Sequence, residues 1–324
     1  MGPLSKLDPL ERHHFISSPA GGLKLFLRHL PARMVSSDKS KIVLYVHGGT
    51  FSSGLSIAHR FDGQSWRDEL VNAGFQVWGL DFAGFGASDP YPEMSQTPEN
   101  KPALGQAGAA SEQLERAVRF ICEHHRATRI SIIAHSWGTI ATGLLAGRCP
   151  ELIERLVFFA PIAWRQKQVE PQIYPAWRLV SLKDQWDRFT QDVPSGEPAV
   201  LNRRDFEEWG ELYLDTDAES RTRSPASVKI PGGPWQDIAL AWAGQLAYDP
   251  ARIRAPVGII RGEWDQASTE ADARWLFDAL KNSPVRREVK ISRATHLMLL
   301  EAARFALYRE AETFLKGNDL PVSS

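Results

Sequence analysis

Short runs of apolar residues alternate with longer amphipathic stretches along most of this chain. Continuous apolar runs are typical of strands buried on both faces of a parallel sheet, and amphipathic stretches are typical of the helices that cover it. We predict strands over residues 14–17, 23–30, 41–46, 75–82, 129–134, 155–160, 256–261 and 286–291. We predict helices over residues 64–73, 108–125, 137–147, 269–281 and 299–315.

The order of these elements predicts an α/β fold. The first two strands flank Ala20-Gly21-Gly22 and should form an antiparallel hairpin. The later strands are separated by helices and should therefore run parallel to one another. We expect an eight-stranded, mostly parallel, doubly wound sheet, whose core domain comprises residues 1–164 and 251–324.

Residues 165–250 interrupt this alternation. The segment contains no run suited to a buried strand, and six of the chain's 11 tryptophans lie in it or at its edge. It is too long for a plain loop. We interpret it as a helical cap domain inserted after the sixth strand. The alternative is a structural insertion that covers an edge of the sheet.

Composition and charge exclude several classes of partner. The 324 residues contain 38 Lys and Arg against 39 Asp and Glu, which gives a net charge of −1. This balance argues against nucleic acid or an anionic membrane as a partner. The longest apolar stretch, residues 156–164, contains a proline and is too short to span a bilayer. The N-terminal residues lack the apolar core of a secretory signal, so we expect a cytoplasmic protein. The sequence leaves a homodimer open.

We find no motif in the sequence that indicates a bound metal ion or cofactor. Cys122 and Cys149 are too few for a disulfide framework or a zinc knuckle. No cluster of His, Cys and Asp has metal-ligand spacing, and no glycine-rich loop precedes a helix in the phosphate-binding manner. We therefore expect no metal and no cofactor, and a small molecule as substrate.

Ser136 lies in the sequence Ala134-His135-Ser136-Trp137-Gly138, between a predicted strand and a predicted helix. A serine on a tight strand-to-helix turn exposes its hydroxyl at the carboxyl edge of the sheet. The turn needs small residues on both sides; Gly138 meets this requirement, and Ala134 adds one methyl group. We predict that Ser136 is a nucleophile, the alternative being a helix-capping serine.

A second turn, His47-Gly48-Gly49-Thr50, follows the strand over residues 41–46. Glycines there let a backbone N–H point into the space above Ser136. The N–H groups of Gly49 and Trp137 would then form an oxyanion hole with two donors. A simple tight turn is the structural alternative.

Asp265 follows the seventh predicted strand, and His296 follows the eighth. The order Ser136, Asp265, His296 is that of serine hydrolases on a doubly wound sheet. All three residues fall at carboxyl ends of strands, where ligands bind in open α/β sheets. We expect His296 to be the general base and Asp265 to orient it. Glu263 is the alternative acid.

Together these motifs resemble the α/β-hydrolase superfamily, over nearly the whole chain outside the cap. The matching segments are His47-Gly48-Gly49, residues 81–88, His135-Ser136-Trp137-Gly138, Gly262-Glu263-Trp264-Asp265 and His296. The resemblance implies a Ser136, His296 and Asp265 catalytic triad. Haloalkane dehalogenases and epoxide hydrolases of this fold need an aspartate in place of the serine, so Ser136 argues against those activities.

The favoured function is hydrolysis of a carboxylic ester or lactone of a small to medium apolar substrate, through an acyl-enzyme intermediate. Aromatic and apolar side chains suit such a pocket. The predicted substrate-binding residues are Thr50, Phe51, Trp164 and Trp177.

Other functions stay open at this stage. An amidase or aminopeptidase similar to the proline iminopeptidases would need cap carboxylates to hold a free amine, and it would lack that family's Gly-Pro-Gly continuation after Gly49. The candidates for the amine site are Asp205, Glu207, Glu208 and Glu211. A non-catalytic ligand binder, carbon–carbon bond hydrolysis and acyl transfer complete the alternatives.

Overall fold

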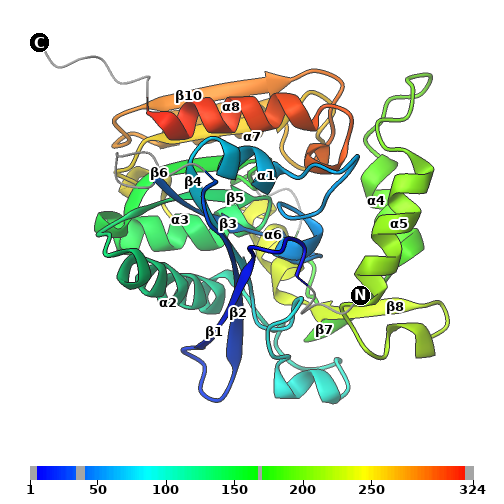
Figure 1. The fold of residues 1–324 in the computed structure, drawn as a ribbon. Coiled ribbons are helices and arrows are strands. Elements are labelled where there is room, and N and C mark those ends of the chain that lie inside the picture. The colour runs from blue at the N-terminus through cyan, green and yellow to red at the C-terminus, as the bar shows by residue number, and fades with distance from the viewer. Residues whose placement is uncertain (1–5, 34–40, 167–169, 318–324) are drawn as a thin grey trace, which may run out of the picture.

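A single eight-stranded sheet organises the computed structural model, which describes residues 6–33, 41–166 and 170–317 (Figure 1). The strands are β1 (Arg12–Ser17), β2 (Lys24–Leu30), β3 (Lys41–Val46), β4 (Phe75–Asp81), β5 (Ile130–His135), β6 (Ile153–Phe159), β9 (Val257–Gly262) and β10 (Arg286–Ile291). Their order across the sheet is β1-β2-β4-β3-β5-β6-β9-β10. Strand β2 runs antiparallel to both of its neighbours, and the other pairs are parallel. The predicted sheet is therefore confirmed.

Helices cover this sheet. They are α1 (Trp66–Asn72), α2 (Ala107–His125), α3 (Gly138–Arg148), α7 (Glu270–Ala279) and α8 (Arg304–Lys316). Helix α1 contacts α8, and α2 packs along α3. Every residue of the central strand β5 is buried between these layers. This burial explains why the strand reads as a continuous apolar run.

The last helix begins later than predicted. Residues 299–303 were expected in the helix, but Met298–Leu300 forms a short 3₁₀ turn and α8 begins at Arg304. The buried carboxylate of Glu301 accepts a hydrogen bond from the Thr295 N–H instead of continuing a helical turn. The local polar contact therefore overrides the apolar periodicity that suggested a longer helix.

The segment after β6 is not wholly helical. It contains α4 (Leu182–Thr190), α5 (Arg203–Leu214) and α6 (Gly233–Trp242), but also β7 (Trp177–Ser181) and β8 (Ser227–Pro231), which pair antiparallel. In Figure 1, α4 and α5 stand beside the main sheet, with β7 and β8 below them. Both strands are only five residues long; β7 is partly exposed, with Leu179 exposed by 42%, whereas β8 is mostly buried but has a lysine at its centre and a proline at its end, so neither is a continuous apolar run.

Contacts from this segment reach the loop that follows β3. The indole Nε1 of Trp209 on α5 donates to the Leu55 carbonyl at 2.9 Å. A Cβ atom placed on Gly49 would lie 2.9 Å from the Pro234 Cβ on α6. The inserted segment therefore lies against the carboxyl edge of the sheet, where a cap was expected.

Candidate active site

Ser136 occupies a strained turn between β5 and α3. Its backbone has φ +54°, in the left-handed region that a residue with a side chain seldom adopts. The Ser136 N–H donates to the Phe159 carbonyl at 3.0 Å, and the Thr139 hydroxyl donates to the Ser136 carbonyl at 2.6 Å. These bonds hold the turn in place. A strained residue fixed in this way is typical of a functional site.

Gly138 is required by the close approach of this turn to β3. A Cβ atom at Gly138 would lie 2.5 Å from the backbone carbonyl oxygen of His47. Ala134, which stands on the other side of Ser136, is fully buried in β5. The extra methyl group at position 134 is thus accommodated, whereas none would fit at position 138.

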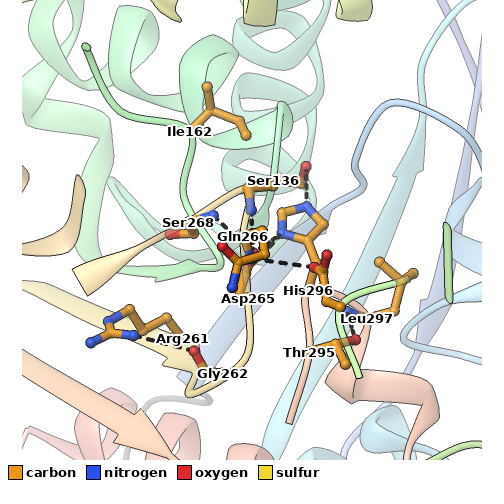
Figure 2. A network of polar contacts seen from close by, with 12 residues as sticks. Ser136, Ile162, Arg261, Gly262, Asp265, Gln266, Ser268, Thr295, His296 and Leu297 are labelled. Atoms are coloured by element: carbon orange, nitrogen blue, oxygen red, sulfur yellow. Dashed lines mark hydrogen bonds and ion pairs between the residues drawn. The ribbon is translucent and has the colours of Figure 1, made fainter. Parts of the chain in front are cut away.

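The structure brings Ser136, His296 and Asp265 together, as Figure 2 shows. The His296 Nε2 lies 2.8 Å from the Ser136 Oγ, and its Nδ1 lies 3.0 Å from both carboxylate oxygens of Asp265. In the neutral imidazole that fits these partners, Nδ1–H donates to Asp265 and Nε2 accepts the serine proton. The three side chains come from the ends of different strands. We call them the Ser136–His296–Asp265 cluster.

Asp265 is held in place by its own loop. Its Oδ1 accepts the N–H groups of Ala267 at 2.9 Å and Ser268 at 2.8 Å. The alternative acid, Glu263, is exposed and accepts the Arg293 N–H at 3.0 Å. The contacts of the two carboxylates therefore distinguish them: Asp265 touches His296, and Glu263 faces away from it.

Two backbone N–H groups remain without an acceptor near Ser136. Within the described part of the chain, neither the Gly49 N–H nor the Trp137 N–H makes a hydrogen bond. A Cβ atom on Gly49 would lie 3.9 Å from the Trp137 Cβ, so the two residues are neighbours. Donors left free beside a serine hydroxyl are suited to bind an oxyanion.

His47 fixes the turn that carries Gly49. Its Nδ1–H donates to the Gly48 carbonyl at 2.7 Å, and its Nε2 accepts the Phe82 N–H at 3.1 Å. Complete burial lowers the pKa of His47, which keeps the imidazole neutral and able to accept. His47 is thus a support for the turn rather than a group that faces Ser136.

His135 supports the loop of His296. Its Nε2 is 3.1 Å from the His296 carbonyl oxygen, and its ring stacks on Phe159 with centroids 4.4 Å apart. Burial holds the pKa of His135 well below its usual range. A neutral ring in this position donates one hydrogen bond and otherwise packs.

The pocket next to Ser136 is small and is closed by the inserted segment. It has a volume of 10 Å³, about the space of one water molecule. Its lining residues are Gly48, Gly49, Thr50, Phe51, His135, Ser136, Arg188 and Leu297. Thr50 and Phe51 also line a larger cavity of 510 Å³ between the core loops and residues 213–230. These two predicted substrate-binding residues therefore line both spaces.

Trp164 and Trp177 are not brought to this pocket. The Trp164 ring stacks on Trp275 of α7, with centroids 5.7 Å apart. The Trp177 Nε1 donates to the Gln96 carbonyl at 2.8 Å, and the Lys229 Nζ lies 4.5 Å from its ring. Their contacts are those of packing residues, so the structure does not support their assignment to substrate binding.

Asp237 of α6 connects the inserted segment to the serine turn. Its carboxylate accepts the Trp137 Nε1–H at 2.7 Å and the Ala107 N–H at 2.6 Å. Burial raises the pKa of Asp237 to about 6. Sequence reasoning did not identify this residue, because nothing local distinguishes it from a surface aspartate on an amphipathic helix.

Arg188 of α4 was also missed, although it lines the pocket at Ser136. Its Nη1 donates to the Thr50 hydroxyl oxygen at 2.7 Å. Burial lowers the pKa of its guanidinium to about 10, so the group is charged at neutral pH. No sequence signal separates this arginine from the others of the segment, because its position depends on how the insertion folds back.

The described residues contain neither a metal-binding group nor a membrane-spanning helix. Across residues 6–33, 41–166 and 170–317, no group of three or more His, Cys, Asp or Glu is placed to hold a metal ion. No helix in these ranges is both long and apolar enough to cross a membrane.

Comparison with known proteins identifies the family. Residues 41–303 match the family model described as the alpha/beta hydrolase fold, which covers most of the chain. The chain therefore belongs to the α/β-hydrolase fold family. No match was found among curated proteins.

Solved structures share this fold at low identity. An epoxide hydrolase from Vigna radiata is 16% identical, with a TM-score of 0.61 and coverage of 95% of this chain and 98% of that one. A thermophilic esterase from Thermogutta terrifontis is 17% identical, with a TM-score of 0.55 and coverage of 94% and 98%. The enol-lactonase from Burkholderia xenovorans LB400 is 16% identical, with a TM-score of 0.58 and coverage of 94% and 100%. At these identities the likeness concerns the fold alone.

Proposed function

We propose that this protein is a serine hydrolase that cleaves a carboxylic ester or lactone through an acyl-enzyme. The observation that carries the proposal is the placement of His296, whose two ring nitrogens contact the Ser136 hydroxyl and the Asp265 carboxylate. A serine hydroxyl is a weak nucleophile until a neighbouring base takes its proton. Asp265 holds the imidazole in the tautomer that can do so.

The chemistry proceeds in two halves. Ser136 Oγ attacks the substrate carbonyl carbon while His296 Nε2 takes the hydroxyl proton. The N–H groups of Gly49 and Trp137 stabilise the resulting oxyanion, each by about 3–4 kcal/mol in comparable sites. The imidazolium then protonates the departing alkoxide. His296 then takes a proton from water as the water oxygen attacks the acyl carbon, and it returns this proton to the Ser136 Oγ as the serine ester bond breaks and the acid leaves.

An aminopeptidase activity is less compatible with the charges around the site. Glu207, Glu208 and Glu211 are exposed on α5; the first two pair with Arg203 and Arg204 of the same helix, and Glu211 pairs with Arg221 beyond it. The pocket at Ser136 is lined by a cation, Arg188, rather than by carboxylates. A cation would repel the free amine of an aminopeptidase substrate, so the ester or lactone is favoured.

A substrate panel tests this proposal. We expect wild-type protein to hydrolyse aryl esters or a lactone faster than a proline arylamide, and Ser136→Ala to lose turnover by about six orders of magnitude. Ser111→Ala is a matched control, because the Ser111 hydroxyl is buried in α2 without a partner among the described residues. The control should retain full activity. Turnover that persists in Ser136→Ala would refute the proposed nucleophile.

A further inference from the structure

Arg188 is a half-buried cation whose hydrogen-bond partners are neutral. Its Nη1 donates to the Thr50 Oγ1 at 2.7 Å and to the Gln185 Oε1 at 3.2 Å. Its guanidinium carbon lies 5.2 Å from the centroid of the Trp235 ring. Among the described residues, no carboxylate forms an ion pair with it. A cation that is partly removed from water and has only neutral partners is able to bind an anion.

Asp192 does not form an ion pair with Arg188. Asp192 follows α4, and its carboxylate accepts the Gln266 N–H at 3.2 Å, beside the Asp265 loop. It attracts the Arg188 charge only from beyond ion-pair distance. Arg178 stands over the same Trp235 ring at 4.8 Å and adds a second positive charge to this region. The local field around Arg188 therefore favours a negative group.

Two more buried donors lie beside Arg188. The Gln185 Nε2 and the Tyr213 hydroxyl lie within hydrogen-bonding reach of each other, and neither has another partner in the described ranges. Tyr213 of α5 lies close enough to Gln185 and Arg188 to interact with both. A tyrosine hydroxyl that accepts from Gln185 can still donate, so Tyr213 and Arg188 are neighbouring donors able to bind a further acceptor.

The position of this group ties it to the substrate. Arg188 lines the pocket at Ser136, and Tyr213 lines the cavity of 510 Å³. Thr50, which accepts from Arg188, lines both spaces. Arg188 therefore lies beside Ser136 and is hydrogen-bonded to a residue that also lines the larger cavity.

We infer that Arg188, with Gln185 and Tyr213, binds a carboxylate of the substrate. The enzyme would then act on an ester or lactone that carries a free carboxylate, such as the half-ester of a dicarboxylic acid, rather than on a wholly apolar ester. One guanidinium balances one negative charge, and its planar fork matches a carboxylate. This inference rests on the proposed function and specifies its substrate class.

Paired substrates test the inference. The first is the 4-nitrophenyl half-ester of glutaric acid, and the second is its neutral methyl ester. We expect wild-type kcat/KM to favour the anionic substrate by about 10- to 100-fold, the range of hydrogen bonds to charged groups. Arg188→Gln should abolish this preference, because it should lower kcat/KM for the anionic substrate by at least about tenfold more than for the neutral one. Arg188→Lys should keep part of it, because the charge remains without the fork.

A matched control separates recognition from folding. Arg178→Gln removes an arginine over the same tryptophan but outside the pocket lining at Ser136, so the preference should persist. If Arg188→Gln lowers kcat/KM equally for both substrates, Arg188 merely holds the Thr50 turn and the inference is wrong. Wild-type protein with no preference for the anionic substrate would also overturn it.

A direct binding measurement tests the carboxylate site independently of the proposed hydrolase activity. Isothermal titration calorimetry should show glutarate binding to wild-type protein at least about tenfold more tightly than neutral glutaramide, and this difference should vanish in Arg188→Gln. If neither ester is hydrolysed but this difference is found, the proposed reaction fails and the carboxylate site stands. If glutarate binds no better than glutaramide, the carboxylate site fails whatever the enzyme hydrolyses.

Discussion

The substitution Gly138→Ala tests whether close packing at Gly138 positions the nucleophile Ser136. The added Cβ would lie 2.5 Å from the His47 backbone oxygen and 3.1 Å from the Val46 Cγ1. Ordinary van der Waals contact begins at 3.4 Å, so the serine turn and the end of β3 must separate by about 0.9 Å. Neither side can yield as a flexible side chain would, because the nearest atom belongs to the backbone.

This displacement should affect stability and activity together. Overpacking of a filled interior costs about 1–3 kcal/mol of unfolding free energy. A shift of about 1 Å between Ser136 and the Gly49 N–H should lower kcat by about 100-fold. Urea unfolding measures the first quantity, and steady-state hydrolysis of an aryl ester measures the second.

Gly108→Ala provides the control for this substitution. Gly108 lies in α2, and a Cβ atom there would meet nothing within 4 Å. Alanine is the better helix former but the position is in the first turn of α2, so this variant should gain less than about 0.5 kcal/mol and keep wild-type kcat. If Gly138→Ala showed the stability and kcat of Gly108→Ala, the argument from close approach would be refuted.

Three further substitutions probe other parts of the structure. Asp265→Asn should lower kcat by about 10⁴ because His296 loses its orienting acceptor, whereas Glu263→Gln should change it by less than about tenfold; the reverse ranking in steady-state assays would reassign the acid. Asp237→Ala leaves two buried donors, including the Trp137 Nε1–H, without an acceptor, and should cost about 2–5 kcal/mol in urea unfolding; an unchanged midpoint would contradict this. Burial lowers the pKa of His29 to about 3, so only the unfolded chain binds its proton as pH falls below about 6.5, and this residue alone should reduce stability by about 1.4 kcal/mol per pH unit down to about pH 4. His29→Phe should reduce that slope, and an identical slope would show that other groups control acid unfolding.

Much of the fold is encoded locally. Strand β3 begins and ends at the residues predicted, because an apolar run bounded by a lysine and by a His-Gly-Gly turn has few other interpretations. The meeting of Ser136, Asp265 and His296 could be predicted as well. All three follow strands that end at one edge of a parallel sheet, so topology alone brings them close together.

The inserted segment could not be predicted in the same detail. Arg188 reaches the pocket only because α4 folds back onto the Thr50 turn, and no local pattern encodes that contact. Trp164 and Trp177 looked suited to a pocket from composition, but tertiary packing directs them to Trp275 and to the Gln96 carbonyl. Long-range packing, rather than residue type, thus decides which side chains face the site.

Covalent labelling tests the central claim that Ser136 is an activated nucleophile. Wild-type protein should react with a fluorophosphonate, and intact-mass analysis should show one adduct. Peptide mapping should place this adduct on Ser136, and His296→Ala should slow labelling strongly because the serine loses its base. Labelling of another serine, or of Ser136 at the same rate without His296, would contradict the account.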